Sequence, residues 1–239
     1  MNNFSFSPIG RISSCYKEKF SIPRQPSLVS EATADLVLLK PYASKEIIRG
    51  LEGFSHIWII FAFHAVPLGQ WKPTVRPPRL GGNKRLGVFA TRSTHRPNPI
   101  GLSAVSLLDI CTGAGEVKLA LGGCDLLDGT PVLDIKPYLP YADAILGAKG
   151  GFAEAVPAKK IQVLFSVSAS KACIEASERL SVDSKLFIEQ LLSLDPRPSY
   201  QAGKQSERIY AAHVYDFNLR WHYPEEQKVE VIDLLPRDD

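Results

Sequence analysis

The stretch HIWIIFAFH, residues 56–64, is an almost continuous run of β-branched and aromatic residues between two histidines. Residues of these types favour a pleated strand over a short helix. Because the run has almost no polar positions, we expect a strand that is covered on both faces. The segments on either side of it in the sequence extend this prediction to much of the chain.

Alternation of apolar and polar residues, rather than helical spacing, dominates the first two thirds of the chain. It predicts a hairpin of LSAVSLLDI (102–110) and EVKLALGG (116–123) across the glycine-containing loop CTGAG. SKEIIRGLEGF (44–54) fits a short helix capped by Ser44. The other predicted strands are SPIGRISS (7–14), DLVLLKPY (35–42) and GTPVLDIKPY (129–138). The sequence therefore predicts a mainly β first part.

The pattern loosens between residues 137 and 157, which is the expected boundary between two domains, 1–145 and 146–239. The second part is expected to combine strands and helices. We expect a strand at KIQVLFSVS (160–168), helices at SKACIEASERL (170–180) and SVDSKLFIEQLLSL (181–194), and a closing strand pair of RIYAAHVYDFNLRWHY (208–223) and KVEVIDLL (228–235).

Charge is unevenly distributed, although the net charge is only +3. No Asp or Glu occurs between Glu52 and Asp109, whereas seven cations fall in that interval. Five of them lie in the proline-rich connector PLGQWKPTVRPPRLGGNKR (67–85), where Trp71 could stack on a base. The connector suits a polyanion contact, and the alternatives are a solvated loop or a dimer contact. The residues predicted to bind RNA are Lys72, Arg76, Arg79, Lys84, Arg85 and Arg197.

Several common sites lack their signatures. The four cysteines are far apart with no Cys-x-x-Cys pair, and no metal-ligand cluster is evident, so we expect no metal. No glycine-rich motif follows a strand and opens a helix, so any nucleotide-containing cofactor must be held by a different architecture. Neither a signal peptide nor a membrane-spanning run is recognisable, which indicates a cytoplasmic protein without a membrane partner.

The loop GVFATRSTHRPNPIGLS, residues 87–103, is the strongest candidate for a binding element. Pro97 and Pro99 restrict the backbone, so that Arg92, Arg96 and Asn98 are oriented before a ligand arrives. A stiff turn with exposed cations is the alternative. Asp134, Lys136 and Tyr138 lie two residues apart and share one strand face, which fits either a polar wall of a site or a solvated face.

These stretches, together with IPRQ (22–25), VRPPRLGGN (75–83), DLLDGTPVLDIKPYLP (125–140) and DPRPSY (195–200), closely resemble the TsaA/YaeB (TrmO) family. The resemblance implies an S-adenosylmethionine-dependent tRNA methyltransferase that modifies the N6 nitrogen of N6-threonylcarbamoyladenosine next to the anticodon of threonine tRNA. It also implies a homodimer with a β-barrel-like, non-Rossmann catalytic domain and a small α/β C-terminal domain. The cofactor-binding residues carried over are Pro23, Arg24, Gln25, Phe63, His64, Arg92, Leu102, Asp128, Gly129 and Thr130.

The reaction needs alignment of the attacking nitrogen with the methyl group and removal of one proton. Asp134 or a water is the expected proton acceptor, while Lys136, Arg92 or Arg96 could steady negative charge on the substrate. Tyr138 and Asn98 complete the predicted catalytic set. A non-catalytic RNA-binding module and a methyltransferase for a small molecule are the alternative functions.

Overall fold

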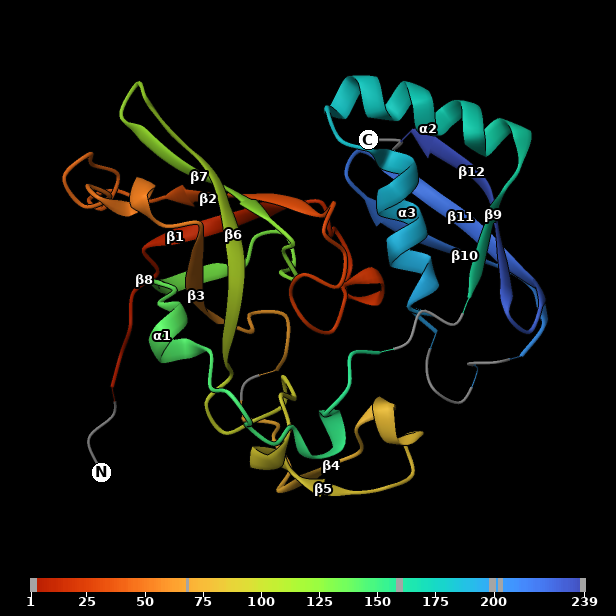
Figure 1. Cartoon of the computed structure of the whole chain (residues 1–239), viewed down its shortest axis with the longest axis horizontal. Coiled ribbons are helices and arrows are strands. Elements are labelled where there is room, and N and C mark those ends of the chain that lie inside the picture. The colour runs from red at the N-terminus through yellow and green to blue at the C-terminus, as the bar shows by residue number, and fades with distance from the viewer. Residues whose placement is uncertain (1–3, 68, 158–160, 198–200, 202–203, 237–239) are drawn as a thin grey trace.

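The first part of the chain is a closed six-stranded barrel. The structure, a computed structural model, describes residues 4–67, 69–157, 161–197, 201 and 204–236. Around the barrel the strand order is β1-β2-β7-β6-β3-β8, and each neighbouring pair is antiparallel (Figure 1). The strands are β1 (Gly10–Ser14), β2 (Thr33–Leu38), β3 (His56–Ala62), β6 (Ile100–Gly113), β7 (Glu116–Gly122) and β8 (Pro131–Pro137). The predicted barrel is confirmed.

The barrel encloses a packed apolar core. On β3, Ile57, Ile59 and Phe61 are buried with Leu36 of β2 and Leu119 of β7. Small barrels of this size are filled by inward side chains rather than left open.

The expectation that β3 is covered on both faces is wrong, because its burial alternates along the strand. Trp58, on the outer face, is half-buried: its Nε1 donates to Asp143 at 3.0 Å, and its ring lies 5.7 Å from that of Tyr138. Asp143 ends the short helix α1 (Pro140–Asp143). The outer face is therefore partly shielded by one helical turn rather than by a second layer.

Local signals succeeded at one hairpin and failed at one helix. The β6–β7 hairpin is confirmed, with Ala114 and Gly115 at its tip. The predicted helix over residues 44–54 is wrong: the segment forms turns and then a 3₁₀ turn, η2 (Leu51–Gly53). Gly50 has a left-handed backbone (φ +87°), which ends right-handed winding before a helix can extend.

The cationic connector leaves the barrel as a separate small ribbon. It contains β4 (Thr74–Val75) and the 3₁₀ turn η3 (Pro78–Leu80), and β4 pairs with β5 (Leu86–Gly87), which directly follows the connector, as seen at the bottom of Figure 1. The 3₁₀ turn η4 (Val88–Ala90) comes next in the chain. Between α1 and the second domain, the chain is mostly irregular apart from η5 (Gly151–Ala153).

The second part is a four-stranded sheet with two helices, which confirms a small α/β C-terminal domain. The sheet order is β10-β11-β12-β9, with β9 parallel to β12 and the other pairs antiparallel. Helices α2 and α3 pack on it (Figure 1). The elements are β9 (Gln162–Phe165), α2 (Val167–Leu180), α3 (Ser184–Ser193), β10 (Ser206–Val214), β11 (Phe217–Glu225) and β12 (Lys228–Pro236).

The sequence run 208–223, predicted as one strand, is two strands joined at Tyr215 and Asp216. Tyr215 has φ +50°, a conformation that usually requires Gly or Asn. Its ring packs 5.1 Å from that of Phe187, and its hydroxyl donates to the Glu31 carbonyl oxygen at 3.2 Å. These contacts with distant residues stabilise a turn that the local sequence, which has no Gly or Asn at this position, does not predict.

The two parts are joined by a buried interface rather than by a loose linker. Cys15 and Tyr16, directly after β1, belong to the apolar core of the second sheet, and Tyr16 pairs with Val214 of β10. The amide of Tyr215 donates to the carbonyl oxygen of Cys15 at 2.7 Å. The segment that follows β1 is therefore held between the barrel and the C-terminal domain. None of the helices described is long and apolar enough to cross a membrane.

A candidate ligand site at one end of the barrel

Three connections leave the barrel at the same end, and the one between β3 and β6 contributes two segments. Because neighbouring strands are antiparallel, the ends of β1, β3 and β7 meet the starts of β2, β6 and β8. The segments that extend from this end are residues 15–32, 63–73, 88–99 and 123–130. All the cofactor-binding residues expected from the resemblance lie in these segments, except Leu102, which is near the start of β6.

One polar cluster joins three of these segments. Arg92 Nη1 donates to Gln25 Oε1. Burial raises the pKa of Asp125 to about 6, while hydrogen bonding from Ser103 and the charge of Arg92 oppose the rise. Ser103 on β6 is itself buried. Gln25, Arg92, Ser103 and Asp125 therefore form what we call the Arg92 cluster.

The residues that precede Gln25 are positioned partly by the second domain. Pro23 is buried, and Arg24 lies at the surface. Desolvation lowers the pKa of Arg24, and the negative charge of Asp195, from the turn after α3, opposes this shift. In the same segment, the Phe20 ring stacks on that of Trp221 of β11 with 6.1 Å between the ring centres, so the C-terminal domain contacts the segment that carries Gln25.

A second cluster surrounds the turn 128–130. Thr130 Oγ1 lies 3.5 Å from His64 Nδ1 and 2.6 Å from the Leu127 carbonyl oxygen, to which it donates. Asp128 pairs with Lys17 at 3.0 Å and accepts from the Ser14 amide at 2.8 Å. These contacts fix the turn against the end of β1.

His64 lies in a positive environment. Partial burial, followed by the charges of Arg11 and Lys19, lowers its pKa. Arg11 also donates to the Gly129 carbonyl oxygen at 3.4 Å, and Lys19 donates to the carbonyl oxygen of Ala65. His64 is thus held neutral near neutral pH, as a hydrogen-bonding group rather than a cation.

Backbone contacts tie the loop that carries Arg92 to the loop that carries His64. The Phe63 amide donates to the Pro99 carbonyl oxygen at 2.8 Å, and the Phe63 ring meets that of Phe61 edge-on at 5.1 Å. Gly101 leaves room for Phe61, since a β-carbon there would lie 2.2 Å from the ring. Within the loop, Arg96 donates to the Thr91 carbonyl oxygen at 3.2 Å and Asn98 is exposed.

The predicted polar wall lies on the outer face of the barrel. Asp134 and Lys136 form an ion pair at 3.1 Å, with 49% and 63% of their side chains exposed, and Tyr138 packs against Trp58. Ile60 pairs with both Leu102 and Asp134, so these three side chains point to the same outer face. The wall therefore adjoins Leu102, whereas Ser103 of the Arg92 cluster points into the protein.

The connector cations predicted to bind RNA, Lys72, Arg76, Arg79, Lys84 and Arg85, are exposed; Arg79 also donates to the Ala155 carbonyl oxygen. Arg197 does not fit that prediction. Its side chain is fully buried and pairs with Asp195 through Nε at 2.7 Å and Nη2 at 2.8 Å. Its guanidinium also lies 3.5 Å from the Tyr223 ring centre, so it supports the turn after α3 and does not reach RNA.

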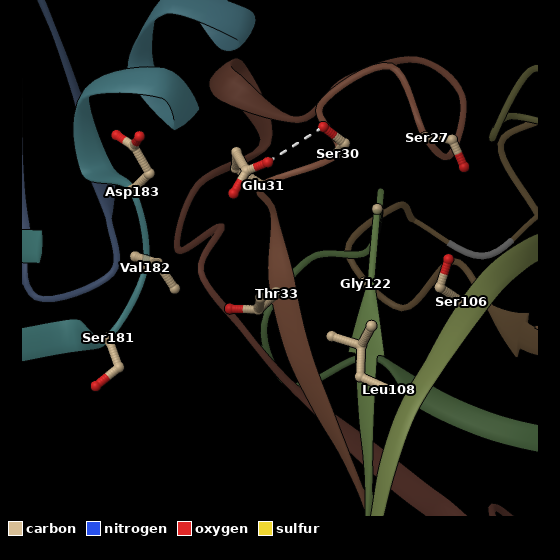
Figure 2. A pocket seen from close by; sticks show the side chains of 11 residues that line it. Ser27, Ser30, Glu31, Thr33, Ser106, Leu108, Gly122, Ser181, Val182 and Asp183 are labelled. Carbon is tan, nitrogen blue, oxygen red and sulfur yellow. Dashed lines mark hydrogen bonds between the residues drawn. The ribbon is translucent and has the colours of Figure 1, made fainter. Parts of the chain in front are cut away.

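A separate cleft of about 440 Å³ lies between the barrel and the turn joining α2 to α3 (Figure 2). Glu31 and Asp183 contribute carboxylates to it, and hydroxyl groups make up much of the rest. No predicted site residue lines this cleft. Its negative charge does not suit a polyanion such as RNA.

Asp125 is not among the site residues predicted from the sequence, and Ser103, Lys17 and Arg11 were missed as well. Asp125 begins the stretch DLLDGTPVLDIKPYLP, but nothing in the local sequence shows that one of its carboxyl oxygens is buried. Arg11 lies between buried residues on β1, and this alternation is a weak sequence signal that its side chain points outward. Among the described residues, no group of three or more His, Cys, Asp or Glu could hold a metal ion.

The fold and the site define a barrel protein with a charged ligand site at one end and no glycine-rich nucleotide loop. Comparison with known proteins gives the family. Residues 11–144 match the tRNA-methyltransferase O N-terminal domain, and residues 158–237 match the TrmO C-terminal domain. The chain belongs to the tRNA-methyltransferase O family.

Similar proteins span the whole chain. A tRNA (adenine(37)-N6)-methyltransferase of Escherichia coli is 48% identical over 237 residues, covering 99% of this chain and 100% of that protein. A Pseudomonas aeruginosa relative whose name refers to S-adenosylmethionine-dependent methyltransferase is 48% identical over 234 residues, covering 98% and 99%. A crystal structure of TrmO from P. aeruginosa superposes with a TM-score of 0.81 at 44% identity, covering 98% of this chain and 99% of that one.

Proposed function

We propose that this protein transfers a methyl group from S-adenosylmethionine to the N6 nitrogen of N6-threonylcarbamoyladenosine at position 37 of threonine tRNA. The Escherichia coli relative, which matches over the full length, is named for methylation of the N6 nitrogen of adenine 37, and the threonylcarbamoyl substituent is the finer part of the proposal. The observation that carries it is the Arg92 cluster: a cation, an amide and a buried carboxyl group converge where the barrel loops meet.

The residues at this end of the barrel fit a zwitterionic donor. When bound, S-adenosylmethionine supplies an already activated methyl group. Arg92 and Gln25 would hold its polar end, and His64, with Thr130, offers neutral hydrogen-bonding groups to its uncharged parts. Pro23, Arg24, Phe63, Leu102, Asp128 and Gly129 complete the cofactor-binding set that we propose.

The chain's own groups then orient the substrate nitrogen and receive its proton. We assign proton acceptance to Asp134, which lies on the exposed outer face beside Leu102 and is paired with Lys136. Lys136 and Arg96 would stabilise negative charge on the carbamoyl oxygen or the threonyl carboxylate. Tyr138 and Asn98 are proposed to contact the substrate base.

The exposed connector supplies the RNA contact. Lys72, Arg76, Arg79, Lys84 and Arg85 present positive charge along a proline-stiffened strip, with Trp71 46% exposed among them. Such a strip suits the phosphates of an anticodon loop, and an exposed indole can stack on an unpaired base.

The assembled form is proposed to be a homodimer in the cytoplasm, with residues 1–145 as the catalytic domain and 146–239 as the C-terminal domain. Three apolar side chains of the barrel are exposed at or near the candidate site: Phe89, Ile100 and Leu102. Apolar groups concentrated in this way are typical of protein contacts.

The activity can be tested on tRNA from cells that lack the gene. Purified protein, S-adenosylmethionine and this tRNA are incubated. The tRNA is then digested to nucleosides, which are separated and identified by mass spectrometry. The proposal expects conversion of N6-threonylcarbamoyladenosine to its N6-methyl form in threonine tRNA. Unchanged nucleosides would refute it, and methylation of a small molecule without tRNA would assign a different substrate class.

The role of Asp134 needs a separate variant. Asp134→Asn keeps the shape of the side chain but removes the base, so we expect methylation to slow about a hundredfold while donor binding persists. A near-normal rate would remove Asp134 from the mechanism. Asp109→Asn, on the far part of β6, serves as a matched control.

A further inference from the structure

One oxygen of Asp125 is buried without a partner. Its Oδ1 accepts no hydrogen bond from any residue in the described part of the chain. An unsatisfied buried acceptor costs free energy, and a buried carboxylate costs more than a neutral group. Native structures contain few such groups, so this one calls for a physical reason.

The surroundings of Asp125 are suited to a charged ligand. Arg92 lies close enough to lower the pKa of the carboxyl, yet its guanidinium donates to Gln25 instead. Ser103 donates to Asp125, and the carboxyl remains the one acidic group of the Arg92 cluster. An unpartnered carboxylate oxygen and an exposed guanidinium therefore both lie at this end of the barrel, near enough for the charge of Arg92 to act on the carboxyl.

We propose that Asp125 binds the α-ammonium group of the methyl donor through Oδ1, while Arg92 binds the donor's α-carboxylate. This inference rests on the proposed function, because it assumes that the donor binds at this end of the barrel. The donor carries two cationic centres, an ammonium and a sulfonium. Of these two cations only the ammonium has N–H groups, so only it can both pair with the charge of the carboxylate and donate a hydrogen bond to Oδ1.

The assignment makes donor binding sensitive to acid. The other titratable groups near Asp125 are Tyr16 and Cys124, and burial raises the pKa of both so far that they stay neutral below pH 8. The ammonium prefers an ionised carboxylate, so donor affinity rises as pH passes through about 6. His64, in the neighbouring cluster, has a pKa below its usual range and could also titrate as the pH falls. Only a variant at Asp125 distinguishes the contribution of Asp125 to the pH dependence from that of His64.

The test is calorimetric titration of the full chain with three ligands. S-adenosylmethionine has both cations, S-adenosylhomocysteine lacks the sulfonium charge, and 5′-methylthioadenosine lacks the whole amino-acid end. Asp125→Asn is expected to weaken the first two about 10- to 100-fold, the usual range for a hydrogen bond between charged groups, and to leave the third unchanged. The pH dependence near 6 disappears in the same variant.

Three outcomes overturn the assignment. Equal weakening of all three ligands places Asp125 at the ribose or in the scaffold, and weakening of S-adenosylmethionine alone places it at the sulfonium. Unchanged affinities remove it from the site. If the wild-type chain binds none of the ligands, the proposed function fails and this inference fails with it.

A second variant keeps the test decisive if Asp125→Asn does not fold. Ser103→Ala removes a hydrogen bond that favours the ionised carboxyl, so the pH midpoint of donor binding should move upward. An unmoved midpoint contradicts the proposal. Asp109→Asn, an exposed carboxylate at the other end of β6, is the matched control and should leave affinity and midpoint unchanged.

Discussion

Arg197 in the C-terminal domain and Arg92 at the end of the barrel each lie near an aspartate. The two clusters differ in how many of their polar atoms have hydrogen-bond partners. Arg197 is buried, makes a two-pronged pair with Asp195, donates to the Lys204 carbonyl oxygen at 2.6 Å and stacks on Tyr223. Arg92 is exposed, and Asp125 beside it keeps one oxygen without a partner. Satisfied polar clusters specify a fold, whereas unsatisfied ones are suited to bind.

The largest expected effect is on the stability of the protein when the fully hydrogen-bonded cluster around Arg197 is broken. Arg197→Ala leaves Asp195 buried beside apolar and aromatic groups, and we expect the free energy of unfolding to fall by about 3–5 kcal/mol in urea titrations. Arg179 makes the same two-pronged contact with Asp216, but at the surface. Arg179→Ala should therefore cost about 1 kcal/mol or less. Equal losses of unfolding free energy in the two variants would show that burial does not make the Arg197 pair more important for stability than the Arg179 pair.

The second effect concerns how stability depends on pH. Burial raises the pKa of Asp125 to about 6, so the unfolded chain releases this proton at lower pH than the folded chain. The native state therefore loses up to about 3 kcal/mol from this group as pH rises from about 4 to 6, and the loss is complete above that range. Asp125→Asn removes this loss.

Urea unfolding of both proteins at pH 4 and pH 7 measures the effect. The stability of the Asn variant relative to wild type should increase between the two pH values. If the difference in unfolding free energy between the two proteins is the same at both pH values, the pKa of the Asp125 carboxyl is not shifted. The Arg92 cluster would then not differ from the Arg197 cluster in this respect.

The third effect is on ligand affinity. Arg92→Ala should weaken donor binding about 10- to 100-fold in calorimetry, because the variant cannot form the charge-assisted hydrogen bond. Stability should change by no more than about 0.5 kcal/mol, since the side chain is exposed. Arg49→Ala, in the turns at the opposite end of the barrel, is the control. A loss of stability without a loss of affinity would place Arg92 with Arg197 as a structural residue.

The smallest effect tests the connector. Replacement of Arg76 and Arg79 by alanine should lower the slope of log affinity for tRNA against log salt by about one for each phosphate that is no longer neutralised. Lys171→Ala on α2, whose side chain is 80% exposed, should leave the slope unchanged. An unaltered slope in the connector variant would reassign this strip to subunit association or solubility.

Local signals in the sequence predict many of the individual strands and helices, whereas the closed barrel was expected only from the resemblance to the family. The β6–β7 hairpin follows from alternation and a glycine at its tip, both local properties. The turn at Tyr215 has no such marker, because contacts with Phe187 and Glu31 stabilise its left-handed backbone. The expected helix at 44–54 has the right residue types, but Gly50 ends right-handed winding.

The candidate site was predictable in its loops but not in its charges. The prolines beside Arg92 indicate a stiff loop, and the resemblance supplied Gln25 and His64, which the fold brings to the same end of the barrel. The burial of Asp125 and Arg197 depends on which distant segments cover them. Since periodicity describes only neighbours along the chain, it could not distinguish Arg92, which we propose to bind the donor, from Arg197, which supports the fold.

The proposed function depends above all on whether the loops at one end of the barrel bind the methyl donor. Equilibrium dialysis of the full chain against radiolabelled S-adenosylmethionine measures this binding directly. We expect saturable uptake of about one donor per chain, which S-adenosylhomocysteine displaces and Arg92→Ala weakens. Uptake that never saturates, with tRNA present or absent, would contradict the proposal.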